Sequence, residues 1–254
     1  MKKVILVLVD GMRSDSLAAC GNEYAVKFAE ENISKVYATT VMPTVTLPCH
    51  FSLFKSVNPD RHGILSNTYV PLVRPIPSLL DVMRRNGRKC GMFYNWEELR
   101  DLNAPGTLTI SSFITTDVPD SDEYIATEAL KNIAKYDLDC SFVYLDETDE
   151  CGHRHGWMGE AYLDCVSRAW GIIHRLRDAF PDHVVIVTAD HGGHEHMHGA
   201  DIPEDLQIPI IISGEGLEAS EKMESANIID IAPTIAAIMG VEPDDDWRGV
   251  SLVK

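Results

Sequence analysis

Short apolar runs alternate along the chain with longer amphipathic stretches. Residues 4–9 are six consecutive Val, Ile or Leu residues, and they stand between Lys2-Lys3 and Asp10-Gly11. This pattern is typical of a strand that is buried on both faces, so we predict a strand over residues 3–9. By the same criteria, further strands are predicted over residues 34–38, 89–94, 140–145, 183–189 and 208–213.

Between these runs, the apolar residues recur at helical spacing and are bounded by residues that start or stop helices. Helices are predicted over residues 47–57, 77–86, 121–135, 159–180 and 227–239. Pro48 lies at the start of the first, Ser121 is expected to cap the third, and Gly87 and Gly240 follow the second and the last. Strands alternating with helices predict an α/β fold, with helices on both faces of a mostly parallel sheet.

No repeat, low-complexity tract or flexible linker divides the sequence. We therefore expect one domain over residues 1–254, in which the least regular stretch, 66–121, is a small insertion that shapes a pocket. Hydrophobic residues make up 45% of the chain, which is enough for a full core and excludes the disordered class.

The cysteines and the N-terminus bear on the compartment. The six cysteines form no C-x-x-C pair, which favours free thiols in a reducing environment. The apolar run 4–9 is too short for the core of a signal peptide or for a membrane span. We therefore expect a cytoplasmic protein without a targeting segment.

Three predicted strands run into residues of the kind that bind metal ions. The strand 3–9 ends at Asp10, and the strand 140–145 is followed by Asp-Glu-Thr-Asp-Glu-Cys-Gly-His at 146–153. The strand 183–189 is followed by Asp-His-Gly-Gly-His-Glu-His-Met-His-Gly at 190–199. Ligands of open α/β sheets bind beyond the carboxyl ends of the strands, so these side chains are expected to meet.

Carboxylate and imidazole ligands together suit zinc, with manganese and iron as competitors. Cysteine is nearly absent from these segments, which favours an open catalytic site over a closed structural one. A solvated His-rich loop that binds metal adventitiously explains segment 190–198 alone, but it does not explain three strand ends.

A hydroxyl group stands just ahead of the predicted helix 47–57. The segment 44–50 reads Thr-Val-Thr-Leu-Pro-Cys-His, and the start of a helix favours a bound anion. A Thr46 alkoxide at a metal pair would be a nucleophile for phosphorus. Spacing alone leaves open the alternative that Thr46 only caps the helix.

The formal net charge of −17 excludes a nucleic-acid polymer or an anionic membrane surface as the main partner. It disfavours a phosphate ligand too, unless cations are supplied locally. Two divalent ions would add about four positive charges at one place and outweigh the distant carboxylates.

Six short motifs follow one another along the chain. They are Val-Asp-Gly-Met-Arg at 9–13, Met-Pro-Thr-Val-Thr-Leu-Pro-Cys-His at 42–50, Asn-Pro-Asp-Arg-His-Gly-Ile at 58–64, Asp-Glu-Cys-Gly-His at 149–153, Thr-Ala-Asp-His-Gly-Gly at 188–193, and His-Gly at 198–199. With this ordered set the chain resembles the alkaline phosphatase superfamily, specifically its type I phosphodiesterase/nucleotide pyrophosphatase family. The resemblance runs from residue 4 to about residue 215, and 248–252 also looks like the family's usual ending.

The resemblance implies two divalent metal ions, most simply Zn²⁺. The ligands of one would be Asp10, Thr46, Asp190 and His191. The ligands of the other would be Asp149, His153 and His198. Thr46 would be the nucleophile, forming a phospho- or nucleotidyl-threonine that water then hydrolyses, and Asn67 would donate to a phosphoryl oxygen.

Some positions depart from the family or have competitors. Cys49 stands where family members usually carry Asn. His194 and His196 compete with His198 for a ligand role. Asp146 competes with Asp149, but only Asp149 gives the D-x-x-x-H spacing that puts both groups on one turn.

Four other side chains have candidate roles. Arg13 is a candidate phosphate contact or a solvated residue, and Tyr69, near Asn67, is a candidate substrate contact. Core packing is expected for Trp157, and a small buried filler role for Cys151.

The resemblance makes a metal-dependent phosphoric ester hydrolase the leading hypothesis, with a small-molecule phosphodiester as substrate. Within the superfamily, the alternatives are a phosphomonoesterase, a phosphonate hydrolase or a phosphosugar mutase. A sulfatase is disfavoured because Cys49 lacks the C-x-P-x-R context. A non-catalytic metal-binding protein on the same fold is the alternative from another class. The segment between Asn67 and Cys140 carries no obvious nucleoside-stacking motif, and the sequence leaves the oligomeric state open.

Overall fold

A seven-stranded sheet forms the centre of the computed structural model, which describes residues 1–254. The strand order is β2-β7-β6-β1-β5-β3-β4. Strand β7 is antiparallel to both of its neighbours, and every other neighbouring pair is parallel. The strands are β1 (Lys3–Val9), β2 (Ile33–Thr39), β3 (Cys90–Tyr94), β4 (Ile110–Phe113), β5 (Cys140–Leu145), β6 (His183–Thr188) and β7 (Gln207–Ser213).

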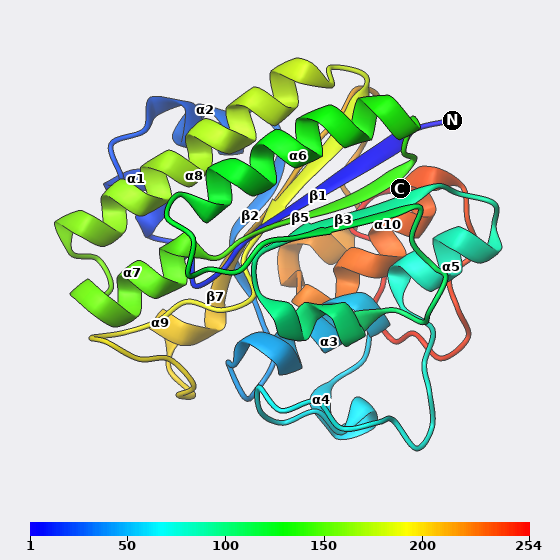
Figure 1. Cartoon of the computed structure of the whole chain (residues 1–254), viewed down its shortest axis with the longest axis horizontal. Coiled ribbons are helices and arrows are strands. Elements are labelled where there is room, and N and C mark those ends of the chain that lie inside the picture. Colours follow the sequence, from blue (N-terminus) through cyan, green and yellow to red (C-terminus); the bar gives the residue numbers. More distant parts are fainter.

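Six long or medium helices cover the two faces of this sheet, which lies between them in Figure 1. One face carries α2 (Glu23–Glu31), α6 (Ser121–Tyr136) and α8 (Glu160–Ala179). The other carries α3 (Thr46–Lys55), α5 (Leu79–Arg85) and α10 (Ile231–Met239). Every residue of β1 after Lys3 is buried, because helices pack on both sides of it. The predicted α/β class with a mostly parallel, doubly covered sheet is confirmed.

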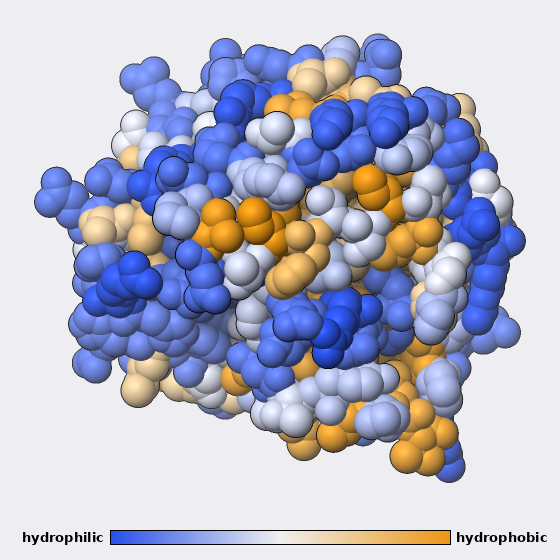
Figure 2. Space-filling model, viewed as in Figure 1, coloured by the Kyte–Doolittle hydropathy of each residue, from blue (hydrophilic) through white to orange (hydrophobic).

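Shorter helices complete the connections. They are α1 (Ser16–Ala19), α4 (Pro59–His62), α7 (Glu147–His155), α9 (Pro203–Leu206) and the 3₁₀ turns η1 (Glu97–Leu102), η2 (Glu221–Ser225) and η3 (Ile228–Asp230). None of the helices combines the length and the apolar character that crossing a membrane requires. The face in Figure 2 is mostly hydrophilic, in keeping with the net charge of −17, and its apolar patches are small and separate.

Most predicted elements lie within two residues of the observed ones, but three differences carry information. Strand β4 was not predicted, because only two of its four residues are apolar. Together with β3 it brings part of the stretch 66–121 into the central sheet. The capping role predicted for Ser121 is wrong: Asp120 occupies the N-cap, and the Ser121 hydroxyl accepts a hydrogen bond from Asn95.

The cysteines are not all free. Cys151 of α7 and Cys165 of α8 form a disulfide, whereas Cys20, Cys49, Cys90 and Cys140 are free. The expectation of six free thiols is therefore wrong for one pair, and Cys151 is a bonded partner rather than a filler. The sequence did not reveal this pairing, because Cys151 and Cys165 are 14 residues apart and meet only when α7 and α8 pack against each other.

One basic residue is buried in the helix layer. Lys55, at the end of α3, is 6% exposed, and its ammonium donates to the carbonyl oxygen of Leu102 over 3.0 Å. It forms no ion pair, and the charge of Asp81 only partly offsets the effect of burial. Burial therefore lowers the pKa of Lys55 from 10.5 to about 8.

We expect Lys55→Met to stabilise the fold at neutral pH and to lose this advantage in alkali. The pKa of Lys55 is lower in the folded protein than in the unfolded chain. The wild type therefore bears the full free-energy penalty of burying this charge below pH 8, and the penalty disappears as the pH rises toward 10.5. The shift corresponds to roughly 3 kcal/mol at pH 7. Urea unfolding at pH 7 and pH 10 measures the difference, and Lys27→Met, at an exposed position of α2, is the control. An equal difference at both pH values would show that Lys55 is not destabilised by its charge.

Candidate metal centre and active site

Three neighbouring strands deliver acidic side chains to one edge of the sheet. Strands β5, β1 and β6 lie side by side and parallel, so their carboxyl ends meet. Asp10 follows β1, Asp146 follows β5, and Asp190 lies two residues after β6. The backbone N–H of Asp10 donates to the carbonyl oxygen of Leu145 over 2.9 Å, which ties the ends of β1 and β5 together. Sites of parallel sheets form at this edge.

Two groups of potential metal ligands form there. The first group consists of the buried residues Asp10, Asp190 and His191. The second group consists of Asp149, His153 and His198. Within each group the ligand atoms lie within 4.8 Å of one another. The rings of His191 and His198 stack with centroids 3.9 Å apart, so the two groups are neighbours. The fold thus brings together the two sets that the family resemblance implied.

The carboxylates of these groups lack the partners that buried acids normally have. Asp10 Oδ1, Asp149 Oδ1 and Asp190 Oδ2 are buried without a hydrogen bond. Burial and the neighbouring carboxylates raise the pKa of Asp10, and burial raises that of Asp190. Divalent cations would satisfy these oxygens, so the donor set fits a metal pair.

The three histidines are oriented as metal-ligating histidines usually are. Each has its Nδ1 within hydrogen-bonding distance of a backbone carbonyl: His191 at 2.8 Å from Gly192, His198 at 2.8 Å from Thr44, and His153 at 3.0 Å from His196. A proton on Nδ1 leaves the lone pair of Nε2 facing the acidic side chains. The carbonyls therefore hold the rings in the orientation that a cation needs.

Helix α7 supplies two members of the second group from one face. Asp149 and His153 are one turn apart, with Oδ2 and Nε2 separated by 3.3 Å. The hydrogen bond to Asp149 raises the pKa of His153 to about 9. Burial opposes ionisation of Asp149, but the hydrogen bond from His153 and the charges of nearby histidines outweigh it and lower its pKa. A cation bound here would replace the proton that the pair now shares.

Thr46 is the first residue of α3, and its hydroxyl lies 3.3 Å from His191 Nε2. The next backbone N–H, of Leu47, donates to Asn67 Oδ1 over 3.0 Å. That bond fixes the exposed Asn67 side chain beside the helix start and leaves its amide nitrogen free to donate. The hydroxyl and the amide therefore lie at the same helix end, beside the first ligand group.

A sequence model of one family, described as type I phosphodiesterase / nucleotide pyrophosphatase, matches residues 4–206. The chain belongs to this family. The resemblance read from the ordered motifs is thereby confirmed.

Curated relatives include ectonucleotide pyrophosphatase/phosphodiesterase family member 7 of Rattus norvegicus, which is 24% identical over 217 residues, or 75% of this chain and 49% of the relative. A 2,3-bisphosphoglycerate-independent phosphoglycerate mutase of Ruthia magnifica is 29% identical over 126 residues, or 47% of this chain and 24% of the mutase. The chain thus spans about half the length of the first of these relatives.

Solved structures share the fold. An inactive variant of murine ectonucleotide pyrophosphatase/phosphodiesterase 5, in complex with AMP, aligns with a TM-score of 0.81 at 14% identity, over 100% of both chains. The phosphonate monoester hydrolase of Agrobacterium radiobacter aligns with a TM-score of 0.74 at 14% identity, over 99% of this chain and 76% of the hydrolase. At such identities the likeness concerns the fold alone.

The competing ligand candidates have other partners. His194 Nδ1 lies 2.8 Å from a carboxylate oxygen of Asp205, and His196 lies on the exposed side, with Nδ1 3.0 Å from the carbonyl of His153. Asp146 accepts from the Tyr144 hydroxyl at 2.7 Å and stands outside both groups. This arrangement favours His198 and Asp149, the residues preferred from the sequence.

Arg13 and Cys49 are also engaged within the protein. The Arg13 guanidinium donates to Asp15 and to the carbonyl of Gly193, so it braces the loop after His191. Cys49 is buried, with its sulfur 3.3 Å from the Thr40 hydroxyl, and it packs behind the start of α3.

Two buried side chains beside the site were not assigned from the sequence. His50, one turn after Thr46, has its Nδ1 2.8 Å from the Thr46 carbonyl and 3.6 Å from Asp190 Oδ2. The Tyr144 hydroxyl contacts the carboxylate of Asp10. His50 stands within the nucleophile motif, which was a usable signal. Tyr144 lies inside an apolar strand, and no pattern marks it.

The indole of Trp157 joins the three segments that carry the acidic residues. Its Nε1 donates to the carbonyl of Gly11 over 2.9 Å. A methyl group on Gly152 would lie 2.5 Å from the indole ring, and one on Gly193 would overlap it. The ring is 7% exposed, which confirms the packing role expected for it. Glycine is therefore required at both positions, because the indole occupies the space of a side chain.

We expect Gly193→Ala to destabilise the fold and to weaken metal binding, because the new methyl group displaces the indole that aligns these segments. Overpacking of this kind costs about 1–3 kcal/mol. Gly171→Ala is the matched control: a methyl group there meets no atom within 4 Å, and alanine stabilises a helix by about 0.5–1 kcal/mol. Thermal unfolding and calorimetric zinc titration compare the two variants. Wild-type stability and zinc affinity in Gly193→Ala would contradict the role given to Trp157.

Proposed function

We propose that this chain is a two-metal hydrolase of phosphate esters, of the phosphodiesterase/nucleotide pyrophosphatase type, in which Thr46 is the nucleophile. The observation that carries the proposal is the pair of adjacent ligand groups with three unpartnered buried carboxylate oxygens, beside a hydroxyl at a helix start. Membership of the family supports the same activity. The imidazole and carboxylate donors make Zn²⁺ the first choice of metal.

Bound divalent ions would supply Lewis acidity, which favours the Thr46 alkoxide and neutralises the charge of a phosphoryl group. The Thr46 oxygen then attacks phosphorus and the leaving alcohol departs, which leaves a phospho- or nucleotidyl-threonine. Water hydrolyses this ester in a second displacement. The Asn67 amide, fixed by Leu47, donates to a phosphoryl oxygen, and the start of α3 favours the same negative charge.

We place the second ester group of a diester in a cavity near Asn67, which neither Thr46 nor any of the proposed metal ligands lines. This cavity of about 730 Å³ extends from Tyr69, two residues after Asn67, along Phe51 and Lys55 of α3. The Tyr69 and Phe51 rings lie with centroids 6.0 Å apart and give the cavity an aromatic wall. The AMP in the structure of a relative is a small nucleotide of the class that this proposal implies. With a net charge of −17, a small molecule rather than a nucleic-acid polymer is the proposed substrate.

Thr46→Ala should lose nearly all turnover and keep its metals, because only the attacking oxygen is removed. Loss of a nucleophile lowers kcat by about 10³-fold or more. Zinc-supplemented hydrolysis of bis-p-nitrophenyl phosphate and p-nitrophenyl phosphate measures the effect, and Thr46→Ser is the matched variant that retains a hydroxyl. Preference for the monoester would move the assignment to a phosphomonoesterase. Undiminished activity of Thr46→Ala would disprove the assigned nucleophile.

Chelation should lower the melting temperature by roughly 10 °C, because a ligand at about 1,000 times its Kd stabilises the fold by about 4 kcal/mol. Without metal, the buried carboxylates are left to repel one another. Scanning calorimetry with and without a chelator measures the shift, and native mass spectrometry counts the ions. Asp10→Asn should respond less to the chelator. A chelator-independent melting temperature in the wild type would count against the paired site.

A further inference from the structure

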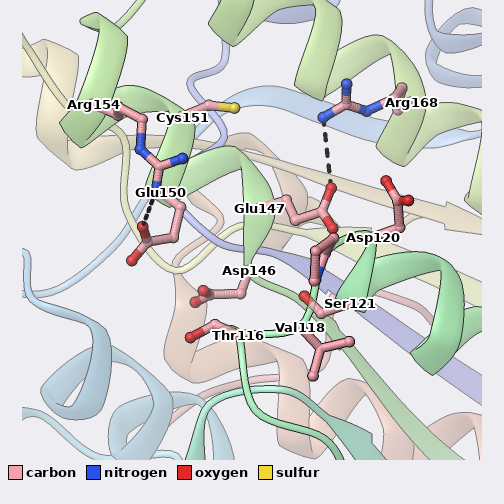
Figure 3. A pocket seen from close by; sticks show the side chains of 11 residues that line it. Thr116, Val118, Asp120, Ser121, Asp146, Glu147, Glu150, Cys151, Arg154 and Arg168 are labelled. Atoms are coloured by element: carbon pink, nitrogen blue, oxygen red, sulfur yellow. Dashed lines mark ion pairs between the residues drawn. The ribbon is translucent and has the colours of Figure 1, made fainter.

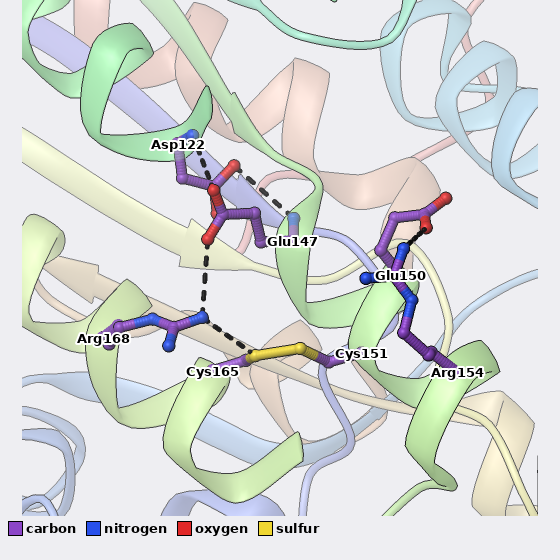
Figure 4. Close-up of a disulfide and its surroundings, with 7 residues drawn as sticks. All are labelled: Asp122, Glu147, Glu150, Cys151, Arg154, Cys165 and Arg168. Carbon is purple, nitrogen blue, oxygen red and sulfur yellow. Dashed lines mark hydrogen bonds and ion pairs between the residues drawn. A yellow bond between two sulfur atoms is a disulfide. The ribbon is translucent and has the colours of Figure 1, made fainter. Parts of the chain in front are cut away.

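The disulfide ties the helix of the second ligand group to its neighbour. Cys151 lies in α7, two residues after Asp149 and two before His153, and its partner Cys165 lies in α8. Residues two apart on a helix point to opposite sides, so the sulfur faces α8 while the ligands face the site. Figure 4 shows the bond bridging the two helices. The cross-link therefore restrains the backbone that carries Asp149 and His153.

A cavity is lined by one of the two cysteines. It has a volume of about 210 Å³ and is lined by Cys151 together with Thr116, Asp120, Arg154 and Arg168, among others. Figure 3 shows Cys151 among the residues that line it. Cys151 is partly exposed, whereas Cys165 is 4% exposed and does not line the cavity. A small thiol that enters the cavity therefore meets the Cys151 sulfur and not its partner.

The other sulfur has a cationic neighbour. Arg168 Nη2 donates to Cys165 Sγ over 3.1 Å and lies 3.5 Å from Glu147 Oε2. When a disulfide is cleaved, the departing sulfur takes the negative charge, and a nearby guanidinium stabilises it. Arg154 lines the same cavity but pairs with Glu150 and has no contact with Cys165. The two sulfurs thus differ in role: Cys151 is the one attacked, and Cys165 is the one that leaves.

We propose that Cys151 and Cys165 form a thiol–disulfide exchange site that opens to low-molecular-weight thiols through this cavity. An external thiolate attacks Cys151 Sγ, the bond to Cys165 breaks, and Cys165 departs as a thiolate beside Arg168. A second external thiolate then attacks the mixed disulfide, which releases the Cys151 thiolate and an external disulfide. Two external thiols are oxidised and the protein pair is reduced, so the electrons balance.

Opening the bond frees α7 from α8 and loosens the second ligand group. The cross-link closes a loop of about 15 residues, for which the expected stabilisation shifts the melting temperature by roughly 5–10 °C. Reduced protein should bind its second metal more weakly than oxidised protein. This consequence rests on the proposed metal role, whereas the exchange itself does not.

The test begins with thiol counting on metal-free protein. In denaturant without reductant, iodoacetamide should add four groups, one for each free cysteine, and six after treatment with dithiothreitol. On native protein, reduced glutathione should expose Cys151 and Cys165 to alkylation, as peptide mass spectrometry reports. Six groups before reduction would show that the pair is not oxidised, and a bond that resists millimolar thiols in the native state would show a structural cross-link only.

Two arginine variants test the assignment of the leaving sulfur. Arg168→Met should slow native reduction by glutathione about tenfold or more, because the Cys165 thiolate loses its donor. Arg154→Met, at the same cavity, should react like the wild type. Equal rates in all three proteins would overturn the assignment. Equal affinity for the second zinc in oxidised and reduced protein would show that the disulfide does not affect the second ligand group. The exchange rates do not depend on whether the proposed hydrolysis is found.

Discussion

The site depends on the close packing of three glycine-bearing segments, two loops and helix α7, around one indole. Trp157 donates to the carbonyl of Gly11 and fills the space beside Gly152 and Gly193. These glycines lie next to Asp10, between Asp149 and His153, and after His191. Because no side chain intervenes, the segments after β1, β5 and β6 approach closely enough for their ligands to meet. A rigid aromatic ring thus sets the relative positions of residues that are far apart in the sequence.

Bringing these carboxylates close together is electrostatically unfavourable, and this feature marks the site. Burial, together with the neighbouring carboxylates, raises the pKa of Asp10, and three buried carboxylates each have an oxygen without a hydrogen-bond donor. Such an arrangement is unfavourable in the protein alone and becomes favourable only with added positive charge. In the proposed function, bound cations rather than the basic residues of this acidic chain would therefore hold the phosphate.

The start of α3 and the disulfide of α7 position further residues beside these carboxylates. Helix α3 presents Thr46 and the Leu47 N–H that holds Asn67, while α7 presents Asp149 and His153 on one face and Cys151 on the other. The same short helix is therefore held by tertiary packing on one side and by a covalent bond on the other. Its position links the proposed chemistry to the redox state of its surroundings.

The sequence by itself determined the fold class and pointed to the candidate site residues. The apolar runs of β1 and β5 are followed directly by acidic residues, so both the strands and the candidate ligands can be recognised without the three-dimensional structure. It did not reveal β4, the Tyr144 contact or the partner of Cys151, and it could only prefer His198 over His194. Those features depend on which surfaces pack together: His194 is engaged by Asp205, and Cys151 meets Cys165 because α7 lies on α8. Local pattern encodes what each residue can do, whereas packing across distant segments decides which partner it has.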